Sequence, residues 1–345
     1  MAHHARRQCC RARVMNSGTD ADAPAPYYAL GPDDVLDALE QLGFPCDGRL
    51  LELNSYENRV YQVGLEDAEP VVVKFYRPGR WSDAAIQEEH SFSRELADRD
   101  VPVIAPLDVQ GGSLHHHGGF RLAVYPRRGG RAPELDRADH RVWLGRFLGR
   151  LHAVGAVAPF RHRPRLELAQ GREAVDYVLA NDLVPGFLME AYRSTVDDLM
   201  DRLARVWDRG SQVPWIRLHG DCHPGNILWT DAGPHFVDLD DALSGPPIQD
   251  LWMLLSGDRQ EMTLQLSDIL EGYEDFFEFD PVQLHLVEAL RTLRIIRHAT
   301  WLARRWDDPA FPKAFPWFGE PRFWEDHVLS LREQAALLDE PPLIL

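Results

Sequence analysis

HGDCHPGN (219–226) and, eleven residues after its end, VDLDDA (237–242) are the two stretches that decide how this chain can be interpreted. Together they place histidine, asparagine and several aspartates in and beside one loop that also contains glycine and proline. Three kinds of site could use such residues: a metal centre, a pair of carboxylates for hydrolysis, or a centre for phosphate transfer. The rest of the sequence has to distinguish between these three.

The spacing of the loop residues favours phosphate transfer. His219, Asp221 and Asn226 follow the pattern H-x-D-x4-N, which is also the pattern of the catalytic loop in protein kinases. In that loop the aspartate accepts the proton of the attacking hydroxyl and the asparagine holds a magnesium ion. The second of two short strands expected after the loop, HFVDL (235–239), places Asp238 where it could bind the metal that bridges the ATP phosphates.

The two competing interpretations explain less of the sequence. A zinc site would use His219, Cys222 and His223, but no second cluster with suitable spacing follows, and the Pro-Gly pair after His223 indicates a tight turn. A hydrolase would use Asp221 and Asp238 with a water molecule. That arrangement would leave the asparagine of the loop and the lysine of an upstream strand without a role.

The chain before the loop begins as a small β-rich unit. PDDVLDALEQL (32–42) predicts a short amphipathic helix, because its apolar residues recur at helical spacing after two acidic residues. RLLEL (49–53), RVYQVGL (59–65) and PVVVKFY (70–76) predict three strands. The polar stretch NSYEN (54–58) predicts a turn between the first two strands.

A helix and two more strands are expected next. The helix should run from about Ser82, as its N-cap, to Asp98, and the strands should be VPVIAPL (101–107) and FRLAVYP (120–126). We expect the histidines 115–117 at a solvent-exposed hairpin tip rather than at a metal, since three adjacent side chains on a strand cannot all face one ion. RRGGRAP, which follows the last strand, predicts a flexible linker.

These elements predict an α+β chain with two lobes. We expect a disordered N-terminal tail over residues 1–26, a β-rich, nucleotide-binding N-lobe over 27–128 and a helical C-lobe with the catalytic and acceptor sites over 129–345. The helical lobe opens with HRVWLGRFLGRLHAVG (140–155), which is apolar at i, i+3, i+4 and i+7.

Composition excludes several classes of protein. The 345 residues are 45% hydrophobic and carry a formal net charge of −17, whereas a non-specific nucleic-acid binder needs a basic face. The four cysteines show no disulfide spacing, which indicates a reducing compartment. No apolar run reaches the length of a membrane span, and the basic N-terminus lacks the apolar core of a secretory signal. We therefore expect a cytoplasmic monomer that binds neither nucleic acid nor membrane.

At this point the sequence shows a resemblance to known proteins. HGDCHPGNILW and FVDLDDA resemble the Brenner-type motif of the aminoglycoside-phosphotransferase and choline-kinase superfamily, which has a protein-kinase-like bilobal fold. More closely, the chain resembles the bacterial stress response kinase A family, a group of Ser/Thr protein kinases, over about residues 28–345. The stretches that carry this resemblance are LNSYENRVYQV (53–63), VVKFYRPGRW (72–81), RLHGDCHPGNILW (217–229), FVDLDDA (236–242), QDLWMLLSGD (249–258) and WLARRWDDPAFPKAFPW (301–317). SYENRVYQ, KFYRP and RRWDDPAFP are specific to this family.

The resemblance implies a nucleotide site in the N-lobe. Lys74 corresponds to the lysine that contacts the α and β phosphates of ATP, and its apolar neighbours mean that it needs a charged partner. Glu88 or Glu89 of the next helix should supply that partner, and we favour Glu89 because Phe92 and Leu96 continue its stripe along the helix.

The turn NSYEN stands where protein kinases have a glycine-rich loop, yet it contains no glycine. The resemblance implies that Ser55 contacts ATP through its hydroxyl and the neighbouring backbone amides, with a plain β-turn as the alternative. Ala123 to Pro126, at the junction of the lobes, should form the adenine hinge.

The remaining polar residues around the loop receive mostly structural roles. Asp240 lies on the same strand face as Asp238 if the strand continues, and could assist it, whereas Asp241 is assigned a structural role. Asp250 should cap its helix or brace the catalytic loop, and His219 should orient that loop by hydrogen bonds.

The function implied by the resemblance is that of a Mg²⁺- and ATP-dependent Ser/Thr protein kinase of a bacterial stress response. It would transfer the γ-phosphoryl group to a Ser or Thr hydroxyl of a protein substrate and would also phosphorylate itself. Two alternatives stay open: a small-molecule hydroxyl kinase of the aminoglycoside or choline type, and a nucleotide-binding regulator without turnover. The regulator is disfavoured because Lys74, Asp221, Asn226 and Asp238 are all present.

The acceptor side of the sequence is ambiguous. Arg291, Arg294 and Arg297 could form a basic stripe for an acidic or phosphorylated acceptor, or they could pair with the acidic segment EGYEDFFEFD (271–280), which is the interpretation we favour. An aromatic group near the C-terminus could line a pocket or pack as core; its members are Trp301, Trp306, Phe311, Phe315, Trp317 and Phe318.

Overall fold

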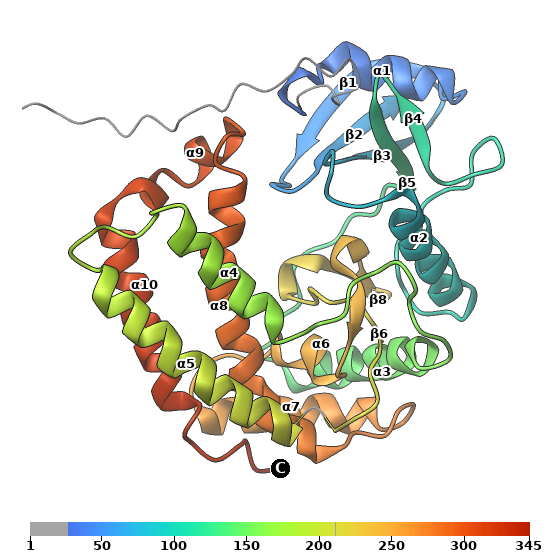
Figure 1. Cartoon of the computed structure of the whole chain (residues 1–345). Helices are drawn as coiled ribbons and strands as arrows, with labels where there is room; N and C mark the ends of the chain where they lie inside the picture. Colours follow the sequence, from blue (N-terminus) through green and yellow to red (C-terminus); the bar gives the residue numbers. More distant parts are fainter. Residues whose placement is uncertain (1–26, 211) are drawn as a thin grey trace, which may run out of the picture.

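The fold is mixed α+β, with a small antiparallel sheet in the N-terminal part and mainly helices after it (Figure 1). The computed structural model describes residues 27–210 and 212–345, and the tail expected over residues 1–26 lies outside the described residues. No helix of the described part combines the length and the apolar character needed to cross a membrane.

A five-stranded antiparallel sheet forms the N-lobe in the order β1-β2-β3-β5-β4. Its strands are β1 (Cys46–Leu53), β2 (Arg59–Leu65), β3 (Ala68–Tyr76), β4 (His115–His117) and β5 (Phe120–Pro126). Alternation along β3 separates two faces: Val73 and Phe75 join the core under α1 (Pro32–Gln41), while Lys74 and Tyr76 point to the opposite face. The period-two pattern of β3 therefore turns the lysine away from the apolar core of the lobe.

Helix α2 (Asp83–Asp98) packs against that second face of the sheet (Figure 1). It begins as expected at Ser82, whose hydroxyl accepts a hydrogen bond from the backbone N–H of Ala85 at 3.2 Å. Ile86 and Leu96 are buried along its inner stripe, which places Glu89 on the buried side as well.

Two expectations for this lobe are wrong. The stretch 101–107 forms no strand and makes only a single parallel bridge, from Val103 to Phe236. Its two prolines lack N–H groups, so a continuous ladder cannot form, and the segment instead links the sheet to the C-lobe. The histidines 115–117 form the edge strand β4, and the hairpin tip is Gly118-Gly119, where the positive φ angles of 57° and 84° suit glycine.

The segment expected to be a flexible linker is attached to the C-lobe. Arg131 forms an antiparallel bridge with Trp229, with backbone N···O distances of 3.0 and 2.6 Å. The chain then enters α3, the predicted first helix of the C-lobe, at Ala138.

The C-lobe contains eight α-helices among its described residues, joined by short strands and 3₁₀ turns. The α-helices are α3 (Ala138–Gly155), α4 (Ala169–Ala180), α5 (Met189–Gly210), α6 (Ile248–Trp252), α7 (Arg259–Tyr273), α8 (Leu286–Arg304), α9 (Ala310–Ala314) and α10 (Pro321–Leu337). The short strands are β6 (Ile216–Leu218), β7 (Ile227–Thr230), β8 (Gly233–Phe236) and β9 (Leu243–Gly245), which pair as β6 with β9 and β7 with β8.

Two groups of helices build this lobe (Figure 1). Helices α3 and α7 lie against each other so closely that a Cβ atom on Gly145 would come within 1.9 Å of the carbonyl oxygen of Ile269. Helices α4, α5, α8 and α10 form the second group, and α9 follows α8 on the side of the β1–β2 turn (Figure 1). The loop after β6 and the turn after β8 lie between these helices and the sheet (Figure 1).

Candidate active site

The loop after β6 is held in place by one buried carboxylate. Asp250, in the first turn of α6, accepts hydrogen bonds from the backbone N–H groups of His219 and Gly220, both at 2.8 Å. The His219 Nε2 atom lies 2.9 Å from the carbonyl oxygen of Val237, so His219 joins the loop to the chain after β8. Gly220 has φ 86°, and a Cβ there would meet the carbonyl oxygen of Asp241 at 2.2 Å. Asp250 therefore braces the loop and His219 orients it, as the sequence predicted.

The carboxylate of Asp221 lies between the side chains of Arg294 and His223. Its Oδ1 atom accepts a hydrogen bond from Arg294 Nη1 at 2.6 Å, and its Oδ2 atom lies 3.5 Å from His223 Nε2. His223 Nδ1 accepts from the N–H of Gly225 at 2.9 Å, so the proton of the neutral ring is on Nε2 and faces the carboxylate. Burial alone would raise the pKa of Asp221, but the charge and hydrogen bond of Arg294, together with the two neighbouring histidines, outweigh burial and lower that pKa.

Asn226 and Asp238 present oxygen atoms that suit a hard cation. The Asn226 amide nitrogen donates to the backbone oxygen of Asp221 at 3.0 Å, which leaves the amide oxygen available. Asp238 has a left-handed backbone conformation, φ 60° and ψ 61°, directly after β8, and its side chain is 46% exposed. A carboxylate and an amide oxygen at this position fit Mg²⁺, which prefers such ligands.

Lys74 pairs with the aspartates after β8 and not with Glu89, so the predicted ion pair is wrong. Its Nζ atom lies 2.8 Å from Asp238 Oδ1 and 3.7 Å from Asp240 Oδ1. Burial would lower the pKa of Lys74, but chiefly Asp238 holds it well above the usual value. Glu89 instead accepts from the hydroxyl of Ser93 at 2.9 Å, and its burial raises its pKa. Glu88 points elsewhere, because its carboxylate accepts from three backbone N–H groups of residues 161–163.

The chain turns at Asp238 instead of continuing as a strand. A 3₁₀ turn over Leu239–Asp241 buries Asp240, which accepts hydrogen bonds from Arg80 and, at 3.0 Å, from Asn58. Burial would raise the pKa of Asp240, but Lys74 and Arg80 lower it strongly. Its Oδ1 atom is buried and finds no hydrogen-bond donor among the described residues, so it can still accept one from a bound ligand or metal-bound water.

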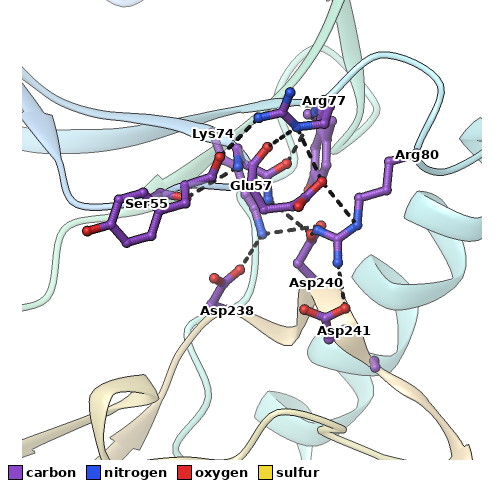
Figure 2. A network of polar contacts seen from close by, with 12 residues as sticks. Ser55, Glu57, Lys74, Arg77, Arg80, Asp238, Asp240 and Asp241 are labelled. Atoms are coloured by element: carbon purple, nitrogen blue, oxygen red, sulfur yellow. Dashed lines mark hydrogen bonds and ion pairs between the residues drawn. The ribbon is translucent and has the colours of Figure 1, made fainter. Parts of the chain in front are cut away.

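The turn NSYEN lies directly above these aspartates, and Figure 2 shows Ser55, Lys74 and Asp238 in the same region. The hydroxyl of Ser55 accepts from the N–H of Asn58 at 3.4 Å, a contact typical of a β-turn. Ala123–Pro126 form the end of β5, beside Lys74 in the register of the sheet. The structure therefore brings Ser55, Lys74 and Asp238 to one region, and a backbone hydrogen bond of 3.0 Å from Val237 to the carbonyl oxygen of Asn226 joins the loop to the same place.

Sequence reasoning did not identify Glu57, which ties the turn to the C-lobe. Its carboxylate accepts from Arg305 Nη2 and from Trp301 Nε1, both at 2.7 Å, and pairs with Arg77 and Arg80 (Figure 2). Burial would raise the pKa of Glu57, but these cations, Arg80 first, lower it. The signal was present in the sequence, since these five residues lie in the stretches that distinguish the stress response kinase A family.

Further contacts join the same three stretches. Asp308 pairs with Arg59 at 3.1 Å and with Arg77 at 3.0 Å. Tyr56 packs against Phe311 and Phe315, with ring centroids 6.5 and 4.8 Å away. The aromatic residues of the C-terminal segment thus pack against each other and against the turn, as the core interpretation predicted.

The favoured pairing of the basic stripe is wrong. Arg291 pairs with Glu288 on its own helix at 3.1 Å, and Arg294 pairs with Asp221. The acidic segment begins in the last turn of α7 and continues beyond that helix, where its Asp275 pairs with Arg146 of α3 at 3.2 Å. Of the three arginines of the stripe, Arg294 therefore reaches the loop after β6, and a role of the stripe in binding an acidic or phosphorylated acceptor stays a prediction.

The zinc interpretation finds no support in the geometry. Cys222 is fully buried, and His219 is engaged with the Val237 carbonyl group. Within residues 27–210 and 212–345, no three side chains of His, Cys, Asp or Glu converge as a zinc site of this kind would require.

Comparison with known proteins agrees with this geometry. The sequence profile of the phosphotransferase enzyme family matches residues 49–286. Over 320 residues the chain is 47% identical to stress response kinase A of Escherichia coli O157:H7 and 46% identical to the serine/threonine protein kinase RdoA of Salmonella typhimurium strain LT2. In both cases the match covers 92% of this chain and 97% of the relative.

Solved structures with the same fold are more distant in sequence. Amicoumacin kinase hAmiN, in complex with AMP-PNP, Ca²⁺ and Ami, is 19% identical with a TM-score of 0.66, over 86% of this chain and 94% of that one. The microcompartment-associated aminopropanol kinase is 17% identical with a TM-score of 0.64, over 89% and 97%. These two similarities concern the fold alone. From the family profile and the close relatives, the chain belongs to the phosphotransferase enzyme family and, within it, to the stress response kinase A family.

Proposed function

We propose that this phosphotransferase is a Mg²⁺- and ATP-dependent Ser/Thr protein kinase of a bacterial stress response, and that it also phosphorylates its own chain. The observation that carries the proposal is the convergence of Lys74 and Asp238, 2.8 Å apart, with Asn226 and Asp221 on the adjoining loop. The names of its close relatives support both the reaction and its biological setting.

Each residue has a defined task in this proposal. Lys74 binds the phosphates of ATP, and Ser55 and the backbone of its turn lie over them. Asn226 and Asp238 would hold Mg²⁺, which when bound offsets the negative charge of the phosphates. Asp221 accepts the proton of the acceptor hydroxyl, and His223 lies 3.5 Å from its second oxygen.

A small-molecule hydroxyl kinase is the second candidate. It is favoured by the similarity in fold to amicoumacin kinase hAmiN and to the microcompartment-associated aminopropanol kinase. The same four residues would serve it, because the chemistry at the phosphorus atom is unchanged. The two candidates differ only in the acceptor.

Labelled ATP distinguishes these candidates. The protein would be incubated with γ-labelled ATP and Mg²⁺, and with either a generic protein or a panel of small hydroxyl compounds. In a second arm, active enzyme would be mixed with the Asp221→Asn chain and analysed by intact mass. We expect label on the inactive chain, for which Ser17 and Thr19 are candidate acceptors. No label on any protein, together with rapid phosphorylation of one small alcohol, would establish the second candidate instead.

A further inference from the structure

Two arginines of α8 lie near the loop that carries Asp221. Arg294 and Arg297 are one helical turn apart and both are solvent-accessible. Arg294 makes a hydrogen-bonded ion pair of 2.6 Å with Asp221. Within residues 27–210 and 212–345, no carboxylate oxygen lies within 4.0 Å of the guanidinium group of Arg297.

The other cations of the cleft are already engaged. Arg80 pairs with Asp240 and, at 2.5 Å, with Asp241, while Lys74 pairs with Asp238. Desolvation lowers the pKa of Arg297. The negative charge of Asp241 raises this pKa, and the positive charges of Arg294 and Arg80 lower it further. Of these four cations, Arg297 is therefore the one without a carboxylate partner within 4.0 Å among the described residues, and it lies one turn from Arg294, which is paired with Asp221.

The ion pair with Arg294 also weakens Asp221 as a general base. A carboxylate that accepts a charge-assisted hydrogen bond is a weaker base, and one of its oxygens is occupied. His223 lies at the other oxygen, at 3.5 Å. If Arg294 moved to another anion, the Oδ1 atom of Asp221 would be released and the carboxylate would become a stronger base.

We propose that the acceptor hydroxyl is flanked by an anionic group, a carboxylate or a phosphate, which Arg294 and Arg297 bind together while Asp221 becomes free. This inference rests on the proposed protein kinase function and names the kind of Ser or Thr segment that it would modify. A basic segment would meet two like charges at the same place, so the arrangement also disfavours cationic acceptors.

The step itself balances without further reactants. The acceptor oxygen forms a bond to the γ-phosphorus of ATP, and the bond from that phosphorus to the β,γ-bridging oxygen breaks. The hydroxyl proton passes to Asp221, and ADP leaves with the bonding electrons on its terminal oxygen. Arg294 and Arg297 take no part in bond making, so they determine specificity and release the base.

Matched peptides test the inference. Four Ser peptides would differ only beside the serine, with Asp, phosphoserine, Asn or Lys at the flanking positions, and kcat/KM would be measured with Mg²⁺ and γ-labelled ATP. The enzymes would be wild type, Arg294→Gln, Arg297→Gln and the double variant. Arg322→Gln is the matched control, because Arg322 lies exposed on α10 and pairs only with Asp326 among the described residues.

We expect wild type and the Arg322→Gln control to favour an anionic peptide over the Asn peptide by about tenfold or more, since a charge-assisted hydrogen bond contributes on that scale. The double variant should reduce the preference to within about twofold, with an unchanged melting temperature because both side chains are exposed. Comparing the Asp and phosphoserine peptides identifies which anion is preferred. Arg294→Lys should retain part of the preference because it keeps the charge.

Two different failures can be told apart. Transfer to all four peptides at similar rates, or a preference that survives in the double variant, would overturn the anionic acceptor and leave the kinase function in place. Transfer to no peptide, alongside phosphorylation of a small alcohol that depends on Asp221, would overturn the proposed protein kinase function and this inference with it.

Discussion

Asp221 and Asp238 are both carboxylates of the same cleft, but their surroundings give them different chemistry. Asp221 is paired with Arg294, whereas Asp238 is paired with Lys74, which we propose binds the phosphates of ATP. The difference arises from the loop braced by Asp250 and from the left-handed turn at Asp238. It allows the two roles to be separated by mutation.

Asp221→Asn should lower kcat by about 100- to 10,000-fold, the contribution typical of a general base. Nucleotide affinity should stay within about twofold of the wild-type value, because the base does not contact the phosphates. Turnover would be followed with labelled ATP and affinity by calorimetry. Asp238→Ala is the matched comparison and should lose Mg²⁺-dependent nucleotide binding. Wild-type turnover in Asp221→Asn would show that another group accepts the proton.

His90 makes a separate prediction about pH. Its ring is buried between the hydroxyls of Tyr76 and Ser113, at 2.6 and 2.9 Å, and burial, followed by the charge of Lys74, lowers the pKa of His90 to about 3. In the unfolded chain this histidine binds a proton as the pH falls below about 6.5, whereas in the folded protein it stays neutral until about pH 3. Its contribution to the free energy of unfolding is therefore fully present above pH 6.5 and is lost as the pH falls toward 3.

We expect the free energy of unfolding to fall by up to about 1.4 kcal/mol per pH unit more in wild type than in His90→Gln below pH 6.5. Glutamine can still bond to the two hydroxyls but does not titrate. Urea unfolding at several pH values between 5 and 7.5 measures the two slopes. Parallel slopes would mean that His90 is protonated in the folded protein.

At the scale of elements, the turn between β1 and β2 depends on a distant part of the chain. Arg305, at the C-terminal end of α8, binds Glu57 through two nitrogens, at 2.7 and 3.1 Å. Glycine lets a loop adopt unusual backbone angles and approach the phosphates closely, and this turn has none. Contacts such as the one with Arg305 therefore have to fix its position. Helix α8 thus contacts the proposed nucleotide site through Arg305, the residue at its C-terminal end, and the proposed acceptor site through Arg294.

Arg305→Gln should raise KM for ATP by roughly tenfold and change kcat much less, because it displaces a binding element and leaves Asp221 intact. Arg304→Gln is the matched control, since Arg304 lies next in the chain but stacks over Tyr177, 4.7 Å from the ring centroid. Steady-state kinetics would measure both variants. Glu57→Gln combined with Arg305→Gln should be no worse than either alone, and additive effects would show that the two side chains act independently.

At the scale of the molecule, the proposed nucleotide site takes residues from both lobes. Ser55 and Lys74 belong to the sheet, and Asn226 and Asp238 follow β6 and β8 of the helical lobe. Binding of the nucleotide should therefore stabilise the arrangement of the two lobes.

A non-hydrolysable ATP analogue with Mg²⁺ at about 100 times its Kd should stabilise the protein by about 2.7 kcal/mol. Differential scanning fluorimetry should show a higher melting temperature that chelation of Mg²⁺ or Asp238→Ala largely removes. A shift that survives both would place the metal elsewhere.

Much of this protein could be predicted from local sequence. The alternation in β3, the Ser82 cap of α2 and the apolar spacing of α3 are properties of neighbouring residues, so they are visible without the fold. The spacing of His219, Asp221 and Asn226 likewise encodes a loop whose side chains work together. These features were sufficient to predict the two lobes and the class of reaction.

The tertiary structure alone decided which residues meet. Periodicity indicates which face of an element is buried, but not which distant element covers it. Glu89 was correctly placed on the buried side of α2, yet Asp238 and Asp240 reach Lys74 because the chain turns after β8. In the same way, the sequence showed an arginine stripe on α8, and only the packing of α8 beside the catalytic loop brought Arg294 to Asp221.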